Sequence, residues 1–191
     1  MPVYNYVGEI CVEGIETFEE ILDSLKDKTI LVLDKCWDCW DKVYALLKEK
    51  DMVDQTIFKF YLKDEEPMVW AKAHKDCIFI PMCGDPEMFP KLLELREHAG
   101  LPAVEILPHA EDEPIFSDET FRWLEEHHIK VWCNSLSLAT RLVYGAGYDD
   151  LKSLRYGGDK GWGVLIDKGV QILQTDWPHE VACYLKEKKM R

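Results

Sequence analysis

Acidic and basic side chains recur where short apolar runs of this chain end. The first run closes on Asp34 and is followed by Lys35, and the second run closes on Lys59. Glu105 lies within a later run, and the last run is followed by Asp176. Carboxylate oxygens are good ligands for Mg²⁺ or Ca²⁺, and a lysine holds a phosphate as a point charge. If these side chains share one face, they predict a divalent cation that holds an oxyanion.

The apolar runs themselves predict β-strands. Six of them are five or six residues long and largely continuous in apolar character, which is typical of parallel strands buried on both faces. They are Thr29–Asp34, Gln55–Lys59, Cys77–Met82, Ala103–Leu107, Lys130–Asn134 and Val170–Thr175. Helical patterns alternate with them, at Thr17–Lys26, Trp37–Lys50, Glu65–His74, Pro86–Ala99, Asp118–His128, Lys160–Lys168 and Pro178–Lys188. We therefore expect a single α/β domain over residues 1–191, with βα repeats over 15–188 and an extra strand within 1–14.

Repeated βα units are compatible with two architectures, an open parallel α/β sheet and a (β/α)8 barrel. In both, ligands bind at the carboxyl ends of the strands, so the polar residues there would share one rim. Polar strand ends are also ordinary, because the chain turns to solvent at those points. Before the last strand, Tyr144–Asp150 and Tyr156–Gly158 are glycine-rich, and we expect them to form flexible loops on this rim.

Composition excludes several classes of function. The formal net charge is −13, which opposes binding to nucleic acids and to anionic membrane surfaces. No apolar run is long enough to span a membrane, and no signal segment precedes the first helix, so we expect a cytoplasmic protein. The seven cysteines are an odd number, and we expect most of them to be buried free thiols.

Cys36 and Cys39 form a C-x-x-C pair that follows a predicted strand and opens a predicted helix. Thiols at a helix start have lowered pKa values, which is the property that dithiol redox proteins use. A redox protein is therefore a minor alternative. A zinc site is less favoured, because a second ligand pair at suitable spacing is missing.

Four segments resemble the glycerophosphodiester phosphodiesterase family in order and spacing. They are Ile15–Leu22 (IETFEEIL), Leu31–Asp38 (LVLDKCWD), Val131–Leu136 (VWCNSL) and Trp162–Pro178 (WGVLIDKGVQILQTDWP). Members of that family are (β/α)8 barrels that hydrolyse glycerophosphodiesters to glycerol 3-phosphate and an alcohol, with a bound divalent cation. The resemblance implies a partial TIM-type barrel of about six βα units, and a metal-dependent phosphoric diester hydrolase of lipid metabolism.

The resemblance also implies roles for five residues. Asp34 matches an acidic metal ligand, for Mg²⁺ or Ca²⁺, and Lys35 matches the lysine close to it. Lys59 matches a lysine after the next strand, and Trp132 matches an aromatic residue that lines the substrate pocket. Asp176 matches the acid of the terminal T-D-x-P motif. We expect Lys35, Lys59, Trp132 and Asp176 to bind a small phosphodiester or phosphate ligand.

Two family motifs are missing from the printed sequence. Family members begin with a strand ending in His-Arg-Gly, followed by an acidic metal pair and a second histidine, and these histidines act as general acid and base. The first histidine here is His74, so the catalytic residues are unknown and the chain resembles the last six βα units. Two interpretations follow, a hydrolase completed from elsewhere and a non-catalytic relative that binds phosphate, a diester or a partner. A homodimer that completes the barrel is a further hypothesis.

Overall fold

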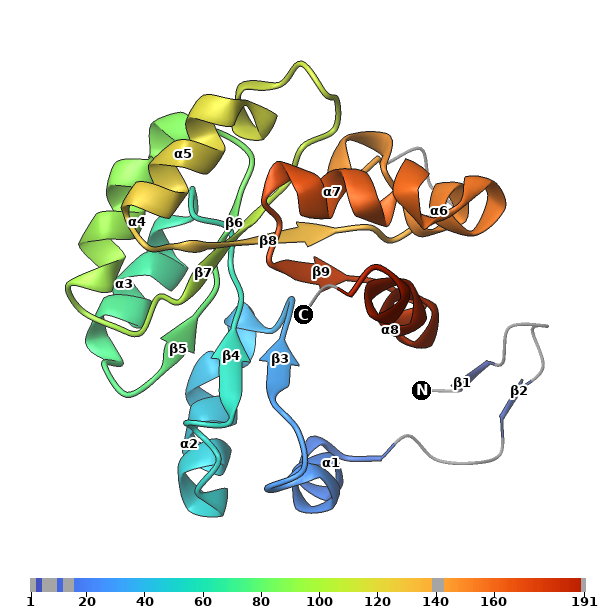
Figure 1. Cartoon of the computed structure of the whole chain (residues 1–191). Helices are drawn as coiled ribbons and strands as arrows, with labels where there is room; N and C mark the ends of the chain where they lie inside the picture. The colour runs from blue at the N-terminus through green and yellow to red at the C-terminus, as the bar shows by residue number, and fades with distance from the viewer. Residues whose placement is uncertain (1–2, 5–9, 12–15, 139–142, 190–191) are drawn as a thin grey trace.

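The computed structural model describes residues 3–4, 10–11, 16–138 and 143–189 of the chain. Its parallel strands follow one another in space in the order in which they occur in the sequence (Figure 1). One sheet has the order β3-β4-β5 and a second has the order β6-β7-β8-β9. These strands are Leu31–Leu33 (β3), Thr56–Phe58 (β4), Ile78–Phe79 (β5), Met82–Cys83 (β6), Ala103–Ile106 (β7), Lys130–Asn134 (β8) and Ile172–Gln174 (β9).

The two sheets meet within one predicted strand, Cys77–Met82, which is divided into β5 and β6. Pro81 lies at the division, and a proline interrupts a ladder because it has no N–H to donate. Backbone hydrogen bonds nevertheless continue across it. The N–H of Ile80 donates to the Phe58 carbonyl at 3.0 Å, and the N–H of Glu105 donates to the Pro81 carbonyl at 2.9 Å. The six predicted strands therefore form one continuous arc.

The arc does not close in the part of the chain that the structure describes. There, β3 is paired only with β4, and β9 only with β8. Two further strands, Val3–Tyr4 (β1) and Ile10–Cys11 (β2), form an antiparallel sheet with each other and do not extend the parallel arc. The fold is thus a parallel α/β arc that corresponds to part of a TIM-type barrel, as the family resemblance implied.

The seven predicted helices are all present. The helices are Phe18–Leu25 (α1), Trp40–Lys50 (α2), Glu65–Ala73 (α3), Phe89–Arg96 (α4), Asp118–Glu126 (α5), Asp150–Tyr156 (α6), Trp162–Lys168 (α7) and Pro178–Glu187 (α8). Only α6 was not predicted. It begins where the Asp149 side chain accepts a hydrogen bond from the Lys152 N–H. None of the described helices is both long and apolar enough to cross a membrane.

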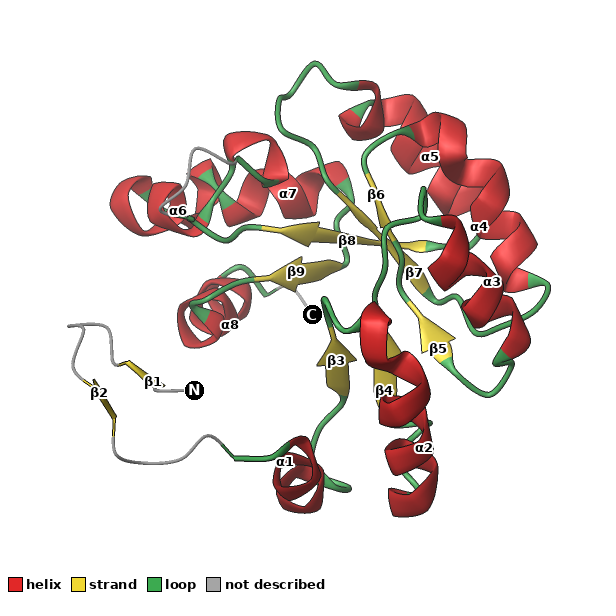
Figure 2. Cartoon of the chain, turned by 180° about the vertical axis from the view of Figure 1, so that it is seen from behind, coloured by secondary structure: helices red, strands yellow, loops and turns green. Residues whose placement is uncertain are grey.

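The main core lies between the strands and the helices that cover their outer side (Figure 2). It includes the fully buried side chains of Phe58, Phe79 and Leu92. The opposite, inner face of the arc carries a much smaller apolar cluster, made by Ile80, Ala103 and Trp132 with Ile57 and Ile172 packed against it. Because side chains alternate between the two faces of a strand, residues two positions beyond this cluster also lie on the inner face. This alternation positions the candidate site.

Candidate functional site

A buried ion pair occupies the inner face of the arc, above the small apolar cluster. Lys59 lies two residues beyond Ile57, and Glu105 lies two residues beyond Ala103. Lys59 Nζ is 2.5 Å from Glu105 Oε2, and each residue is only 2% exposed. Burial raises the pKa of the Glu105 carboxyl, and the positive charge of Lys59 opposes that rise. Each charge is the counter-ion of the other, and removing one would leave an uncompensated buried charge.

Side chains from β8 and β9 complete the surroundings of the lysine. The Trp132 indole N–H donates to Gln174 Oε1 at 3.2 Å, and Lys59 Nζ donates to the same oxygen at 3.5 Å. Lys59 Nζ also lies 4.9 Å from the centre of the Trp132 ring. The predicted residues Lys59 and Trp132 are therefore brought together, and Glu105 and Gln174 join them from two further strands.

Asp34 and Lys35 lie at the end of β3, and both are exposed. The negative charge of Asp34 raises the pKa of Glu105 further, so Asp34 lies within electrostatic reach of the buried pair. Lys35 has a φ of 55°, a left-handed conformation that turns the chain out of the strand. The structure thus places Asp34 and Lys35 side by side at the carboxyl end of β3.

Asp176 is exposed beyond the end of β9, and its backbone is held by a carboxylate that the sequence analysis missed. The Asp176 N–H donates to Oδ2 of the fully buried Asp150 at 3.0 Å. Asp150 Oδ1 accepts from the Ser135 hydroxyl at 2.7 Å, the Trp162 indole N–H at 2.7 Å and the Thr175 hydroxyl at 2.8 Å. These partners are distant from Asp150 in the sequence, so no local motif indicated that Asp150 binds them. Asp150 joins the ends of β8 and β9 to the start of α6.

The glycine-rich segment before α6 is packed against the rim. Gly145 and Ala146 are buried, and the Ala146 N–H donates to the Pro108 carbonyl at 3.0 Å. Gly145 has a φ of +58°, and a Cβ there would lie 2.7 Å from the Asn134 carbonyl oxygen. This close approach to β8 requires glycine at position 145, and the predicted flexibility of the loop stays a prediction.

The described side chains offer few ligands for a divalent cation. In this part of the chain no three His, Cys, Asp or Glu side chains are placed to hold one metal ion. Near the rim, Asp34 is a single carboxylate and Glu105 is already paired with Lys59. One carboxylate leaves a hard cation mostly hydrated and weakly held. The described residues therefore do not fit the predicted Mg²⁺ or Ca²⁺ site.

The cysteines do not have the properties of a dithiol redox centre. Burial raises the pKa of the half-buried Cys36, whereas a redox dithiol needs a lowered value. Burial also raises the pKa of Cys77 and of Cys133 to about 12, and that of Cys83 to about 11. All three are free thiols, as predicted, whereas Cys183 and Cys39 are exposed.

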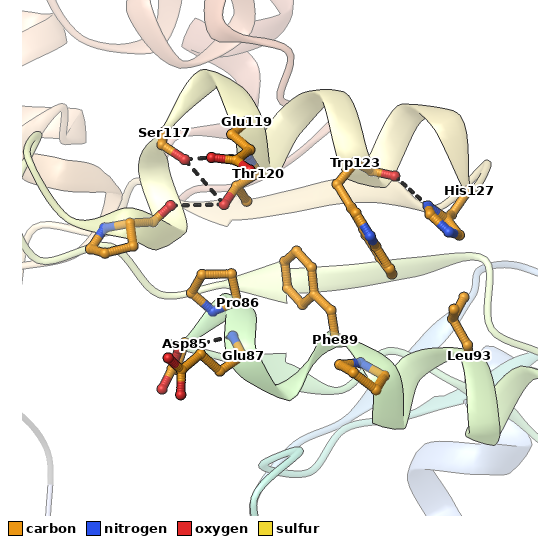
Figure 3. A pocket seen from close by; sticks show the side chains of 12 residues that line it. Asp85, Pro86, Glu87, Phe89, Leu93, Ser117, Glu119, Thr120, Trp123 and His127 are labelled. Atoms are coloured by element: carbon orange, nitrogen blue, oxygen red, sulfur yellow. Dashed lines mark hydrogen bonds between the residues drawn. The ribbon is translucent and has the colours of Figure 1, made fainter.

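A cavity of about 800 Å³ lies away from the inner face, between α4 and α5 and the segments that precede them (Figure 3). Phe89 and Trp123 face each other across it, with ring centres 4.8 Å apart, and His127 stacks on Trp123 at 3.8 Å. Asp85, Glu87 and Glu119 add negative charge to its lining. This cavity belongs to the outer helical layer, and none of the predicted site residues lines it.

Comparison with known proteins relates the fold to phosphodiesterases. A solved glycerophosphoryl diester phosphodiesterase from Parabacteroides distasonis is similar, with a TM-score of 0.71 and 17% sequence identity. The match covers 98% of this chain and 61% of that one, so this chain spans less than two thirds of its length. No curated protein matches the chain. Residues 81–185, more than half of the chain, match the family model DUF4996, described as a domain of unknown function. The chain therefore belongs to the DUF4996 family.

Proposed function

We propose that this protein is a phosphoric diester hydrolase of the glycerophosphodiester phosphodiesterase type, which releases glycerol 3-phosphate and an alcohol. The observation that supports this most is a shared fold. The parallel arc resembles a solved glycerophosphoryl diester phosphodiesterase over 98% of this chain. Its inner face carries Lys59 and Trp132 near the carboxyl ends of their strands, where ligands bind in this kind of fold.

A phosphodiester carries one negative charge, so the charges around the inner face decide how it could be held. Lys59 is deep and already neutralised by Glu105, so it cannot attract an anion by itself. The exposed Lys35 adds the positive charge that the rim needs, because Asp34 and Asp176 repel an anion. The two exposed carboxylates can instead accept hydrogen bonds from the glycerol hydroxyls. Trp132 provides an apolar wall against the carbon skeleton.

Hydrolysis requires a water oxygen to bond to phosphorus while the bond to the leaving alcohol breaks. Asp34 is an exposed carboxylate whose negative charge acts on the buried Glu105. It would accept the proton of the attacking water. We derive no step through a metal ion, because the described residues do not fit one. The predicted cation therefore remains a proposal without support from these side chains.

Binding without hydrolysis is the second candidate. It is favoured by the same lack of a three-ligand metal group in the described residues. Such a protein would hold a phosphate or a diester on the rim without turnover. A partner or a second copy of the chain would then pair with the edge strands β3 and β9. Light scattering at micromolar concentration tests the homodimer.

A single assay separates the two candidates. Release of glycerol 3-phosphate from glycerophosphocholine is measured with and without Mg²⁺ or Ca²⁺, in the wild type and in Asp34→Ala. Asp54→Ala is the matched control, because Asp54 is exposed just before β4, at the opposite end of the strands. Turnover that Asp34→Ala abolishes and Asp54→Ala preserves supports the hydrolase. A folded wild type that shows no turnover but binds glycerol 3-phosphate in calorimetry supports the second candidate.

A further inference from the structure

A smaller cavity, of about 430 Å³, opens on the rim at the carboxyl ends of β4, β6 and β7. Thioether, aliphatic and aromatic side chains supply most of its lining, and the charged residues Lys63 and Asp85 are also part of it. The lining includes Tyr61, Met82, Met88, Leu107, His109 and Tyr144. A pocket of this composition accepts an organic group rather than a phosphate, because it offers little positive charge and much apolar surface.

Tyr61 connects this cavity to the centre of the arc. It lies two residues beyond Lys59, so it belongs to the same inner face. Burial raises the pKa of the Tyr61 hydroxyl, and the neighbouring Tyr144, Asp34 and Glu105 raise it further. Tyr61 therefore lines the cavity and lies on the same inner face as the buried ion pair. A diester whose phosphate occupies the rim beside Lys59 would place one of its alcohol groups in this cavity.

His109 is the histidine that lines this cavity, and its ring is held in one orientation. Its Nδ1 lies 2.6 Å from the carbonyl oxygen of Val143. A carbonyl can only accept a hydrogen bond, so Nδ1 carries the hydrogen and Nε2 is left for other partners. The backbone N–H of His109 donates to Glu113 Oε2 at 2.8 Å, and this contact fixes the main chain of the loop. Histidines held in this way by a carbonyl are common among general acids and bases.

We propose that His109 is the general acid that protonates the departing alcohol, and that this alcohol occupies the cavity between Tyr61 and Tyr144. The proposal rests on the proposed hydrolase function. A water oxygen forms the new bond to phosphorus, and the bond from phosphorus to the alcohol oxygen breaks with its electron pair left on that oxygen. Nε2 of the His109 imidazolium supplies the proton to that oxygen. Asp34 accepts the proton lost by the water and releases it to solvent, and the imidazole takes up a proton from solvent in turn.

The test compares two leaving groups in two variants. Glycerophosphocholine has an alkyl alcohol that leaves poorly without a proton, whereas the p-nitrophenyl ester of glycerol 3-phosphate has a leaving group that needs none. His109→Asn keeps an N–H near the position of Nδ1, and thus the bond to Val143, but has no group at the position of Nε2. His98→Asn is the matched control, because His98 follows the end of α4, at the opposite end of the fold.

We expect His109→Asn to lower kcat for glycerophosphocholine by about 10²–10⁴-fold, the usual contribution of a general acid. We expect kcat for the nitrophenyl ester to fall by less than about tenfold, and His98→Asn to match the wild type on both substrates. Equal losses of His109→Asn on both substrates, or no loss on either, would overturn the role of His109 while leaving the hydrolase intact. A folded wild type that cleaves neither substrate would overturn the hydrolase, and the role of His109 with it.

Discussion

The buried pair between Lys59 and Glu105 allows a quantitative prediction. Lys59→Met keeps the length and apolar stem of the side chain but leaves the Glu105 carboxylate buried without its counter-charge. Removing one partner of a buried ion pair costs about 3–5 kcal/mol of unfolding free energy. In a domain of this size each kcal/mol lowers Tm by about 2–4 °C, so we expect Tm to fall by about 6–20 °C.

Two controls isolate the cause of that loss. Lys91→Met breaks an ion pair with the same 2.5 Å separation, but its partner Glu65 is 77% exposed. Water replaces the lost lysine there, so Tm should stay close to that of the wild type. The double variant Lys59→Met/Glu105→Leu removes both charges and should recover most of the stability.

The penalty in Lys59→Met also depends on pH. Burial raises the pKa of Glu105, and Lys59 is the largest influence that opposes this rise. Without Lys59 the pKa rises further, so the carboxyl becomes neutral at a higher pH. A raised acid pKa stabilises the folded state at low pH, and this stabilisation is lost as the pH rises through that value. The difference in unfolding free energy between variant and wild type, measured by urea unfolding, should therefore be smaller at pH 5 than at pH 8.

Equal Tm values for Lys59→Met and Lys91→Met would contradict this prediction, because burial would then not distinguish the two pairs. A larger loss of unfolding free energy in Lys59→Met at pH 5 than at pH 8 would contradict it equally.

Two further substitutions test the rim. Gly145→Ala should lower the unfolding free energy by about 1–3 kcal/mol, because its backbone is left-handed and its Cβ would meet the Asn134 carbonyl oxygen at 2.7 Å. Gly84→Ala should be close to neutral in the same urea titration, since nothing lies within 4 Å of its Cβ, and equal losses would contradict this account. Asp150→Asn should cost about 1–3 kcal/mol, because an amide nitrogen would replace an acceptor of its buried donors. Thermal melts with the exposed Asp167→Asn as control check this, and similar Tm values for the two variants would show that the Asp150 cluster carries no stability.

The sequence predicted the strands and most helices because continuous apolar runs and helical periodicity are local patterns. The split of one strand at Pro81 and the presence of α6 were missed. For α6 the signal was available but weak, since Asp149 is a capping residue followed by Leu151 and Leu154, which are both exposed. A helix whose leucines are exposed lacks the buried apolar stripe by which an amphipathic helix is usually predicted from its sequence.

The site was predicted only in part, because its contacts join residues far apart in the chain. Alternation along single strands places Lys59 and Trp132 on one face once the strand order is known. The partner of Lys59 could not be identified, because pairing with Glu105 depends on the register of β4 and β7 across an intervening strand. His109 is an exposed loop residue, and nothing in the neighbouring sequence indicates the cavity that it lines.

We propose that the inner face near Lys59 and Trp132 holds the phosphate of a glycerophosphodiester. The most direct test is a crystal structure of the protein soaked with glycerol 3-phosphate. We predict phosphate density on the inner face, within reach of Lys59 and Lys35, with the glycerol carbons against Trp132. Density confined to the cavity between α4 and α5, or no density in a crystal whose inner face is open to solvent, would contradict the claim.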